Sequence, residues 1–206
     1  MIQLSRSGLR LSASDADLDA LAAQFAARHV IQLPAFLDGG LGSLVDERVS
    51  RAPFRARIEN GLEIEDALDD ANLAALCHFL LNDPRLFSLI DRLTGCGPIV
   101  SFTGRVYRRH AATKPGEHYY PWHDDVSEDR RVAISVNLGR VPYAGGLLQL
   151  RDAQSHVTLA EIANLGRHDA MLFRVSPALQ HRVTPVTGQA ARTVLTGWFR
   201  GHSHNS

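Results

Sequence analysis

Residues 170–199 read AMLFRVSPALQHRVTPVTGQAARTVLTGWF, and this stretch decides the fold class. It contains three short apolar runs, over residues 170–175, 181–186 and 192–199, that are rich in β-branched and aromatic residues. Pro177 and Gly188 separate the runs, and such residues are typical of the turns between strands. We therefore expect three consecutive strands near the C-terminal end of the chain.

The same pattern continues toward the N-terminus as far as Pro98. Four further strand-like runs are expected, over residues 99–108, 131–138, 147–150 and 157–162. Glycine or proline stands between most of them, at Gly139, Pro142, Gly145-Gly146 and Gly166. Short strands at such regular spacing indicate a sandwich or barrel rather than a parallel sheet built from βαβ units.

Residues 1–97 have a mostly helical pattern. Ser14 is a good N-cap and begins a helix, and further helices are expected over residues 41–50, 71–81 and 84–93. A short strand is expected over residues 29–33, and a hairpin over residues 54–66 around Asn60-Gly61. We predict a single domain over residues 1–206, in which the helices and the hairpin of residues 1–97 pack on a β-core over residues 98–200.

Composition excludes several classes of protein. The 206 residues are 45% hydrophobic and carry a net charge of zero, which is typical of a soluble globular domain and unlike a nucleic-acid or membrane-surface binder. Two cysteines, Cys77 and Cys96, cannot form a disulfide framework. Residues 1–12 contain no apolar signal segment, and a cytoplasmic location is expected. The oligomeric state is left open.

The residues that carry chemistry lie in the β-rich part. His123-Asp124-Asp125 is the only His-x-Asp in the chain, and on an extended strand His123 and Asp125 would share one face while Asp124 would face away. His181 follows 56 residues after Asp125, and Arg192 follows 11 residues after His181. Two histidines and one carboxylate form a facial triad that leaves open positions on Fe(II). An arginine on a neighbouring strand can hold the far carboxylate of a dicarboxylate cosubstrate.

With these residues the segment from Ile99 to Arg200 resembles the 2-oxoglutarate- and Fe(II)-dependent dioxygenase superfamily, and most of all its prolyl-hydroxylase-like branch. The segment from Tyr120 to Asp125, with the sequence YPWHDD, resembles the aromatic lead-in to the metal-binding motif of that family. Gly145-Gly146 resembles the turn that follows the motif, and Trp198-Phe199 resembles the closing strand.

This resemblance implies a mainly β protein with flanking helices, whose core is a double-stranded β-helix (jelly-roll or cupin-like). It implies that His123, Asp125 and His181 are the catalytic Fe(II) ligands, and that Arg192 and Tyr107 bind 2-oxoglutarate. The implied reaction consumes O2, hydroxylates a small molecule or an amino-acid or peptide side chain, and releases succinate and CO2. Some members carry a hydroxyl two residues after the arginine, where this chain has Val194, so the second residue beside Arg192 is left open.

A different class of function uses the same three ligands. A cupin-like metal-dependent binding module, isomerase or hydrolase would need no 2-oxoglutarate, and Arg192 at its spacing favours the dioxygenase. We expect the hairpin that contains Arg55 and Arg57, together with the loop of residues 109–120, to set the substrate. The short chain favours a small molecule over a peptide, and no nucleic-acid or membrane partner is expected.

Overall fold

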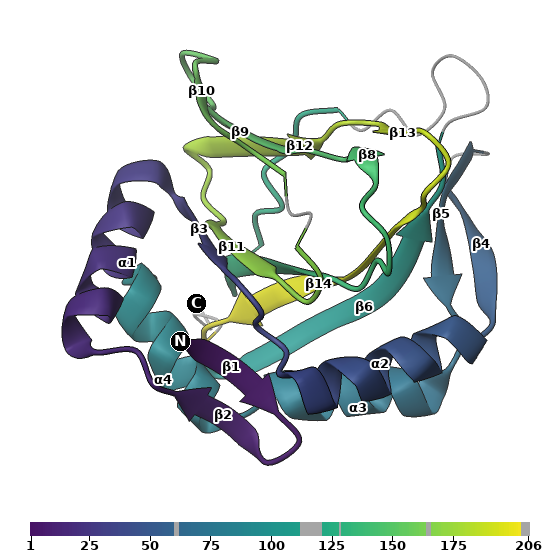
Figure 1. The fold of residues 1–206 in the computed structure, drawn as a ribbon. Helices are drawn as coiled ribbons and strands as arrows, with labels where there is room; N and C mark the ends of the chain where they lie inside the picture. Colours follow the sequence, from purple (N-terminus) through teal and green to yellow (C-terminus); the bar gives the residue numbers. More distant parts are fainter. Residues whose placement is uncertain (60–61, 112–120, 128, 164–165, 203–206) are drawn as a thin grey trace.

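The centre of the fold is a seven-stranded antiparallel sheet with the strand order β3-β11-β7-β14-β6-β5-β4 (Figure 1). The structure, a computed structural model, describes residues 1–59, 62–111, 121–127, 129–163 and 166–202. The strands of this large sheet are β3 (Val30–Leu33), β4 (Phe54–Glu59), β5 (Leu62–Leu68), β6 (Ser101–Arg109), β7 (Arg130–Asn137), β11 (Ala170–Arg174) and β14 (Arg192–Arg200). The strand that begins at Arg192 therefore lies in the middle of the sheet.

A second, smaller layer lies over one face of the large sheet (Figure 1). It has the strand order β10-β9-β12, with β9 (Leu148–Asp152), β10 (Thr158–Ile162) and β12 (Leu179–Val183), and a separate pair is formed by β8 (Ala144–Gly145) and β13 (Val186–Thr187). Buried residues from both layers, among them Leu150, Met171, Phe173 and Leu179, pack into one cluster between them. This arrangement is the double-stranded β-helix that the family resemblance implies.

Helices cover the other face of the large sheet (Figure 1). They are α1 (Asp15–Arg28), α2 (Gly39–Arg51), α3 (Ala71–Leu81) and α4 (Pro84–Thr94). Each begins after a polar N-cap whose side chain accepts from backbone amides, namely Ser14, Asp38, Asp70 and Asp83. Phe25, Leu81, Ile90, Val106 and Phe199 belong to the large apolar core between these helices and the sheet. The expected helices are confirmed.

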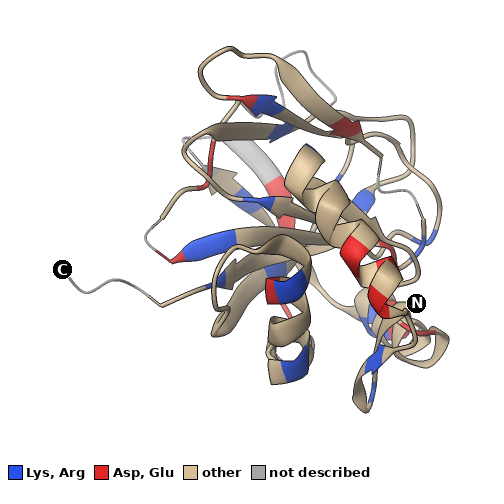
Figure 2. Cartoon of the chain, turned by 90° about the vertical axis from the view of Figure 1, so that its left-hand side faces the viewer, with Lys and Arg blue, Asp and Glu red and all other residues tan. Residues whose placement is uncertain are grey.

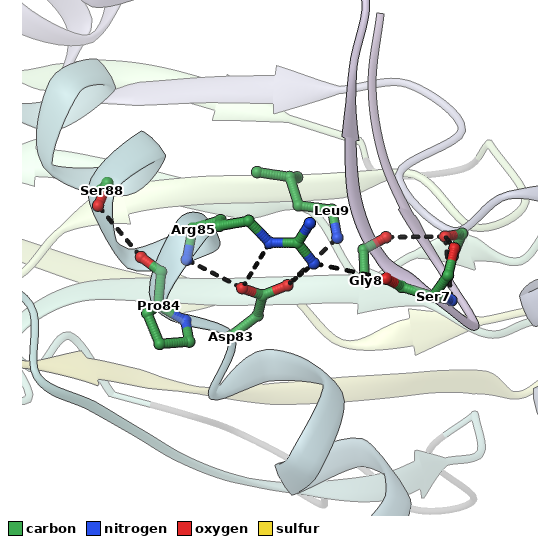
Figure 3. Close-up of polar contacts among 8 residues, drawn as sticks. Ser7, Gly8, Leu9, Asp83, Pro84, Arg85 and Ser88 are labelled. Atoms are coloured by element: carbon green, nitrogen blue, oxygen red, sulfur yellow. Dashed lines mark hydrogen bonds and ion pairs between the residues drawn. The ribbon is translucent and has the colours of Figure 1, made fainter.

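An N-terminal hairpin, which the sequence analysis did not predict, is formed by β1 (Ile2–Ser5) and β2 (Gly8–Leu11). Figure 3 shows its attachment to the start of α4: the amide of Leu9 donates to Asp83 over 3.3 Å, and Arg85 donates to the carbonyl of Ser7 over 3.4 Å. Gly8 has φ +99°, and a Cβ there would lie 2.0 Å from Arg85 Nη2. Contacts with a distant helix, rather than a local pattern, explain this hairpin.

Most expected helices and strands agree with the observed bounds to within two residues, and one does not. The strand predicted over residues 181–186 is wrong as a single element, because β12 ends at Val183 and β13 begins only at Val186. Pro185 lies between them and has no amide hydrogen for a ladder. The hairpin predicted over residues 54–66 is confirmed and extends to Leu68, while its turn at Asn60-Gly61 lies outside the described residues.

Acidic and basic residues are interspersed over helices and strands, in line with the zero net charge (Figure 2). Among the described residues no single helix has both the length and the hydropathy to cross a bilayer; α3 and α4 would meet both conditions only as a pair, and they are bent by 59°.

Candidate functional site

Two histidines face each other across the edge of the small sheet. His123 and His181 form an isolated antiparallel bridge, in which each backbone amide donates to the other residue's carbonyl, over 3.1 and 2.7 Å. Directly opposed residues in such a pair send their side chains to the same face, and the two ring centroids lie 4.3 Å apart. His123 Nδ1 lies 3.0 Å from the carbonyl oxygen of Pro121, to which it donates, and Nε2 is the ring nitrogen that lies toward Asp125.

Asp125 joins this pair through an unexpected backbone conformation. The prediction of an extended strand over residues 123–125 is wrong, because Asp125 has φ +57° and no strand includes it. Its carboxylate nevertheless lies 3.8 Å from His123 Nε2 and 3.3 Å from His181 Nε2. The ligand atoms of all three residues lie within 4.8 Å of one another. Asp124 accepts from the amide of Val126 over 3.0 Å, so its carboxylate caps its own loop.

Two side chains hold Asp125 in this conformation, and sequence reasoning assigned neither of them this role. Trp198 Nε1 donates to Asp125 Oδ2 over 3.0 Å, and Arg130 Nη1 donates to the Asp125 carbonyl over 3.2 Å. The Arg130 guanidinium carbon also lies 3.7 Å from the centre of the Trp198 ring. Strand alternation could have predicted Trp198, because Arg192 and Trp198 are six residues apart on β14 and therefore share its face.

The protonation states suit a metal. Burial raises the pKa of Asp125, but the hydrogen bond and charge of His181, with smaller effects from His123 and Trp198, lower it to about 2. Burial, with a smaller effect from His123, holds the pKa of His181 below its ordinary value, although the hydrogen bond to Asp125 raises it. A carboxylate and a neutral His181 imidazole are therefore present near pH 7, and the side chain of His123 is 42% exposed, which leaves one side of the group open. This donor set fits the facial triad of non-haem Fe(II).

Arg192 lies on the same inner face, toward the other end of β14. It is 1% exposed, donates to Tyr107 Oη over 2.7 Å and to Ser135 Oγ over 3.3 Å, and is also hydrogen-bonded to Tyr143. No carboxylate pairs with it among the described residues, and its Nε has no partner there. A buried cation whose partners among the described residues are hydroxyl groups can pair with an anionic ligand.

Two features near Arg192 bear on questions left by the sequence. The hydroxyl that is missing at Val194 is provided by Ser135 on β7, whereas Thr196 on β14 donates to the carbonyl of Ile134. Gly146, in the Gly-Gly turn, lies so near the arginine that a Cβ would be 2.9 Å from Arg192 Cδ. The turn therefore leaves room for the guanidinium.

A buried carboxylate beside Tyr107 was also missed. The side chain of Glu65 on β5 is fully buried, and its oxygens lie 3.2 Å from Arg57, 2.8 Å from Arg105 and 3.5 Å from Arg109. The Arg109 guanidinium carbon lies 4.8 Å from the centre of the Tyr107 ring. This cluster fastens the β4–β5 hairpin to the sheet next to Tyr107, the hydrogen-bond partner of Arg192. Of the two expected substrate-setting elements, the hairpin strands are thus placed, and residues 112–120 of the loop, with Tyr120, lie outside the described residues.

Comparison with known proteins agrees with this geometry. Residues 106–200 match the sequence model of the 2OG-Fe(II) oxygenase superfamily, and no curated protein matches the chain. An oxidoreductase of the 2OG-Fe(II) oxygenase family from Burkholderia pseudomallei has a similar fold, with 16% identity, a TM-score of 0.66 and 98% of each chain covered.

Two other solved structures share the fold. A prolyl-4-hydroxylase from Pseudomonas putida is 20% identical, with a TM-score of 0.63, over 90% of this chain and 99% of that one. The non-haem α-ketoglutarate-dependent epimerase SnoN of nogalamycin biosynthesis is 16% identical, with a TM-score of 0.65, over 91% of this chain and 84% of that one. The resemblance found in the sequence is thus confirmed: residues 106–200 match the sequence model of a family of oxygenases that use Fe(II) and 2-oxoglutarate, and these solved structures share the fold of the chain.

Proposed function

We propose that this protein is a hydroxylase in which His123, Asp125 and His181 bind Fe(II), and in which Arg192 and Tyr107 bind the C5 carboxylate of 2-oxoglutarate. The reaction converts a substrate C–H bond, O2 and 2-oxoglutarate to an alcohol, succinate and CO2. The observation that carries the proposal is the pairing of two sites on one inner face: a His-Asp-His group, and a buried Arg192 that meets only hydroxyls among the described residues.

The chain's own residues contribute orientation and charge. Trp198 and Arg130 hold the Asp125 carboxylate toward both histidines, and Ser135 and Tyr107 hold the Arg192 guanidinium. Fe(II), when bound with 2-oxoglutarate and O2, supplies the oxidation of the C–H bond. Hydroxyl partners leave the positive charge of Arg192 available to an anion, whereas an internal carboxylate would neutralise it.

The substrate is proposed to be a small molecule or an amino-acid or peptide side chain. Proteins of this fold include a prolyl-4-hydroxylase and an epimerase of nogalamycin biosynthesis, so the fold serves both kinds of chemistry.

The test is the formation of succinate from 2-oxoglutarate in the presence of Fe(II) and ascorbate, first without substrate and then with metabolite and peptide pools. Wild type and Asp124→Ala should turn over 2-oxoglutarate, and His181→Ala should not. If Co(II) binds at the three ligands but no pool yields Fe(II)-dependent succinate, the protein is a metal-dependent isomerase, hydrolase or binding module instead.

A further inference from the structure

His123 reaches the candidate metal centre from a segment with little backbone support. Within residues 121–127, the only bridge to a neighbouring strand is that between His123 and His181. Pro121 has no amide hydrogen to add a bond, and at Asp125 the backbone turns away in the left-handed conformation. Side-chain contacts must therefore supply much of what keeps this segment on the edge of β12.

Trp122 provides such contacts. As the neighbour of a bridged residue, it lies on the opposite face of the small sheet from His123. Two guanidinium carbons lie over its ring, Arg151 from β9 at 4.3 Å and Arg182 from β12 at 4.6 Å from the centroid. Both distances are within the range of a cation–π interaction.

The two arginines are themselves held in place. Arg151 Nη2 donates to Gln180 Oε1 over 2.7 Å, and Arg182 Nε donates to Gln149 Oε1 over 2.6 Å. Each of these bonds joins β9 to β12, so the platform beneath Trp122 spans two strands of the small sheet. A ring docked on such a platform is fixed relative to both strands.

We propose that Trp122 is a positioning residue for the metal ligand His123. Its contacts with Arg151 and Arg182 hold the segment against the small sheet, so that the His123 ring stays beside His181 before metal binds. Metal affinity depends on such partners outside the ligands, because ligand atoms must be held to within a fraction of an ångström. The inference rests on the proposed function only in taking His123 as a metal ligand.

The expected effect is on metal affinity. One cation–π contact at a partly exposed site corresponds to roughly a 2- to 5-fold change in an equilibrium constant, so removal of both by Trp122→Ala should weaken Co(II) binding about 5- to 25-fold. Trp122→Phe keeps an aromatic face and should restore affinity to within about 3-fold of wild type. Phe79→Ala, which removes a 78% exposed aromatic ring on α3, is the matched control and should change nothing.

The experiment is a Co(II) titration of the metal-free full chain, followed by the visible absorption of bound Co(II). In a His123→Ala background, Trp122→Ala should cause no further loss, because the proposed route through His123 is already gone. Arg151→Gln combined with Arg182→Gln should reproduce the loss with Trp122 intact, and this variant serves if Trp122→Ala does not fold.

The outcomes separate the two proposals. If wild type fails to bind Co(II), or if His181→Ala binds Co(II) as tightly as wild type, the proposed metal site itself is overturned. If wild type binds Co(II) at this site and Trp122→Ala or the double arginine variant binds it as tightly, only the present inference is overturned. The inference is also overturned if Trp122→Ala lowers affinity further in the His123→Ala background.

Discussion

Replacement of Arg192 by methionine should separate the stability of this protein from its binding of 2-oxoglutarate. Arg192 is 1% exposed, and among the described residues it meets hydroxyls and no anion. A buried charge without a counter-ion is destabilising, and an apolar side chain of similar volume is often neutral or stabilising in its place. The free energy of unfolding of the metal- and cosubstrate-free protein should therefore be unchanged or raised in Arg192→Met.

The same substitution should weaken cosubstrate binding strongly. A hydrogen bond to a charged group contributes about 1.5–3 kcal/mol, so the Kd of 2-oxoglutarate should rise roughly 10- to 150-fold. 2-Oxoglutarate at 100 times its Kd for wild type should stabilise wild type by about 2.7 kcal/mol. For a chain of this size, such stabilisation corresponds to a rise in Tm of about 5–11 °C. In Arg192→Met, the same concentration of 2-oxoglutarate should raise the Tm by about half as much or less. Arg192→Lys keeps the charge without the planar fork and should recover only part.

Thermal unfolding of the metal-free protein measures the first effect. Thermal unfolding of the Co(II)-bound protein, with and without 2-oxoglutarate, measures the second effect without turnover. Arg200→Met is the matched control, since Arg200 ends the same strand and donates to Asp129 over 2.6 Å. It should leave the 2-oxoglutarate shift intact. An equal shift in wild type and Arg192→Met, or loss of Co(II) along with the cosubstrate, would refute the assignment of Arg192 as the carboxylate anchor.

Four further outcomes are expected. Asp125→Ala should abolish tight Co(II) binding and Asp124→Ala should keep it; equal loss in a titration would contradict the observed loop geometry. Trp198→Phe removes an indole donor and should weaken Co(II) binding roughly 2- to 12-fold, with unchanged affinity speaking against its role. Asp83→Ala should cost about 0.5–2 kcal/mol by urea unfolding. The hydrogen bond from Arg85 lowers the pKa of Asp83 in the folded protein. Above about pH 4, the pKa of an unfolded aspartate, wild type should therefore be more stable than Asp83→Asn, which still caps α4. This difference in the free energy of unfolding should vanish as the pH falls through the pKa of Asp83 in the folded protein. Burial raises the pKa of the Cys77 thiol to about 11, so a thiol reagent at pH 8 should label it only after unfolding, and fast labelling of the folded protein would show that the thiol is accessible.

Local patterns predicted much of the architecture. Ser14 begins α1 because its side chain and that of Asp17 cap each other's backbone amides, a signal contained in four consecutive residues. The run from Arg192 to Phe199 is a strand because it is apolar, β-branched and bounded by turn residues. Where a local rule failed, another feature of the chain outweighed it, as at Pro185, which divides one expected strand into β12 and β13.

The proposed metal triad shows where local reasoning reaches its limit. Alternation on an extended strand correctly grouped Asp125 with His123, but the physical reason was wrong. Asp125 is turned toward His181 by a left-handed backbone, and Trp198 and Arg130 from two other strands hold its carboxylate and carbonyl there. The residue types were readable from the sequence, and the conformation was not.

The fold class and the residue types of the proposed metal ligands and carboxylate anchor could be read from the sequence, because these depend on side-chain chemistry and on periodicity within single strands. Which groups surround these residues depends on the tertiary structure. Ser135 and Tyr107 meet Arg192 across separations of 57 and 85 residues, and Trp198 meets Asp125 across 73. Such contacts follow from the register and order of strands in the sheet, and a shift of one residue would turn each side chain to the opposite face. That register is fixed by packing between the two sheets and the helices, which no single segment of the chain contains.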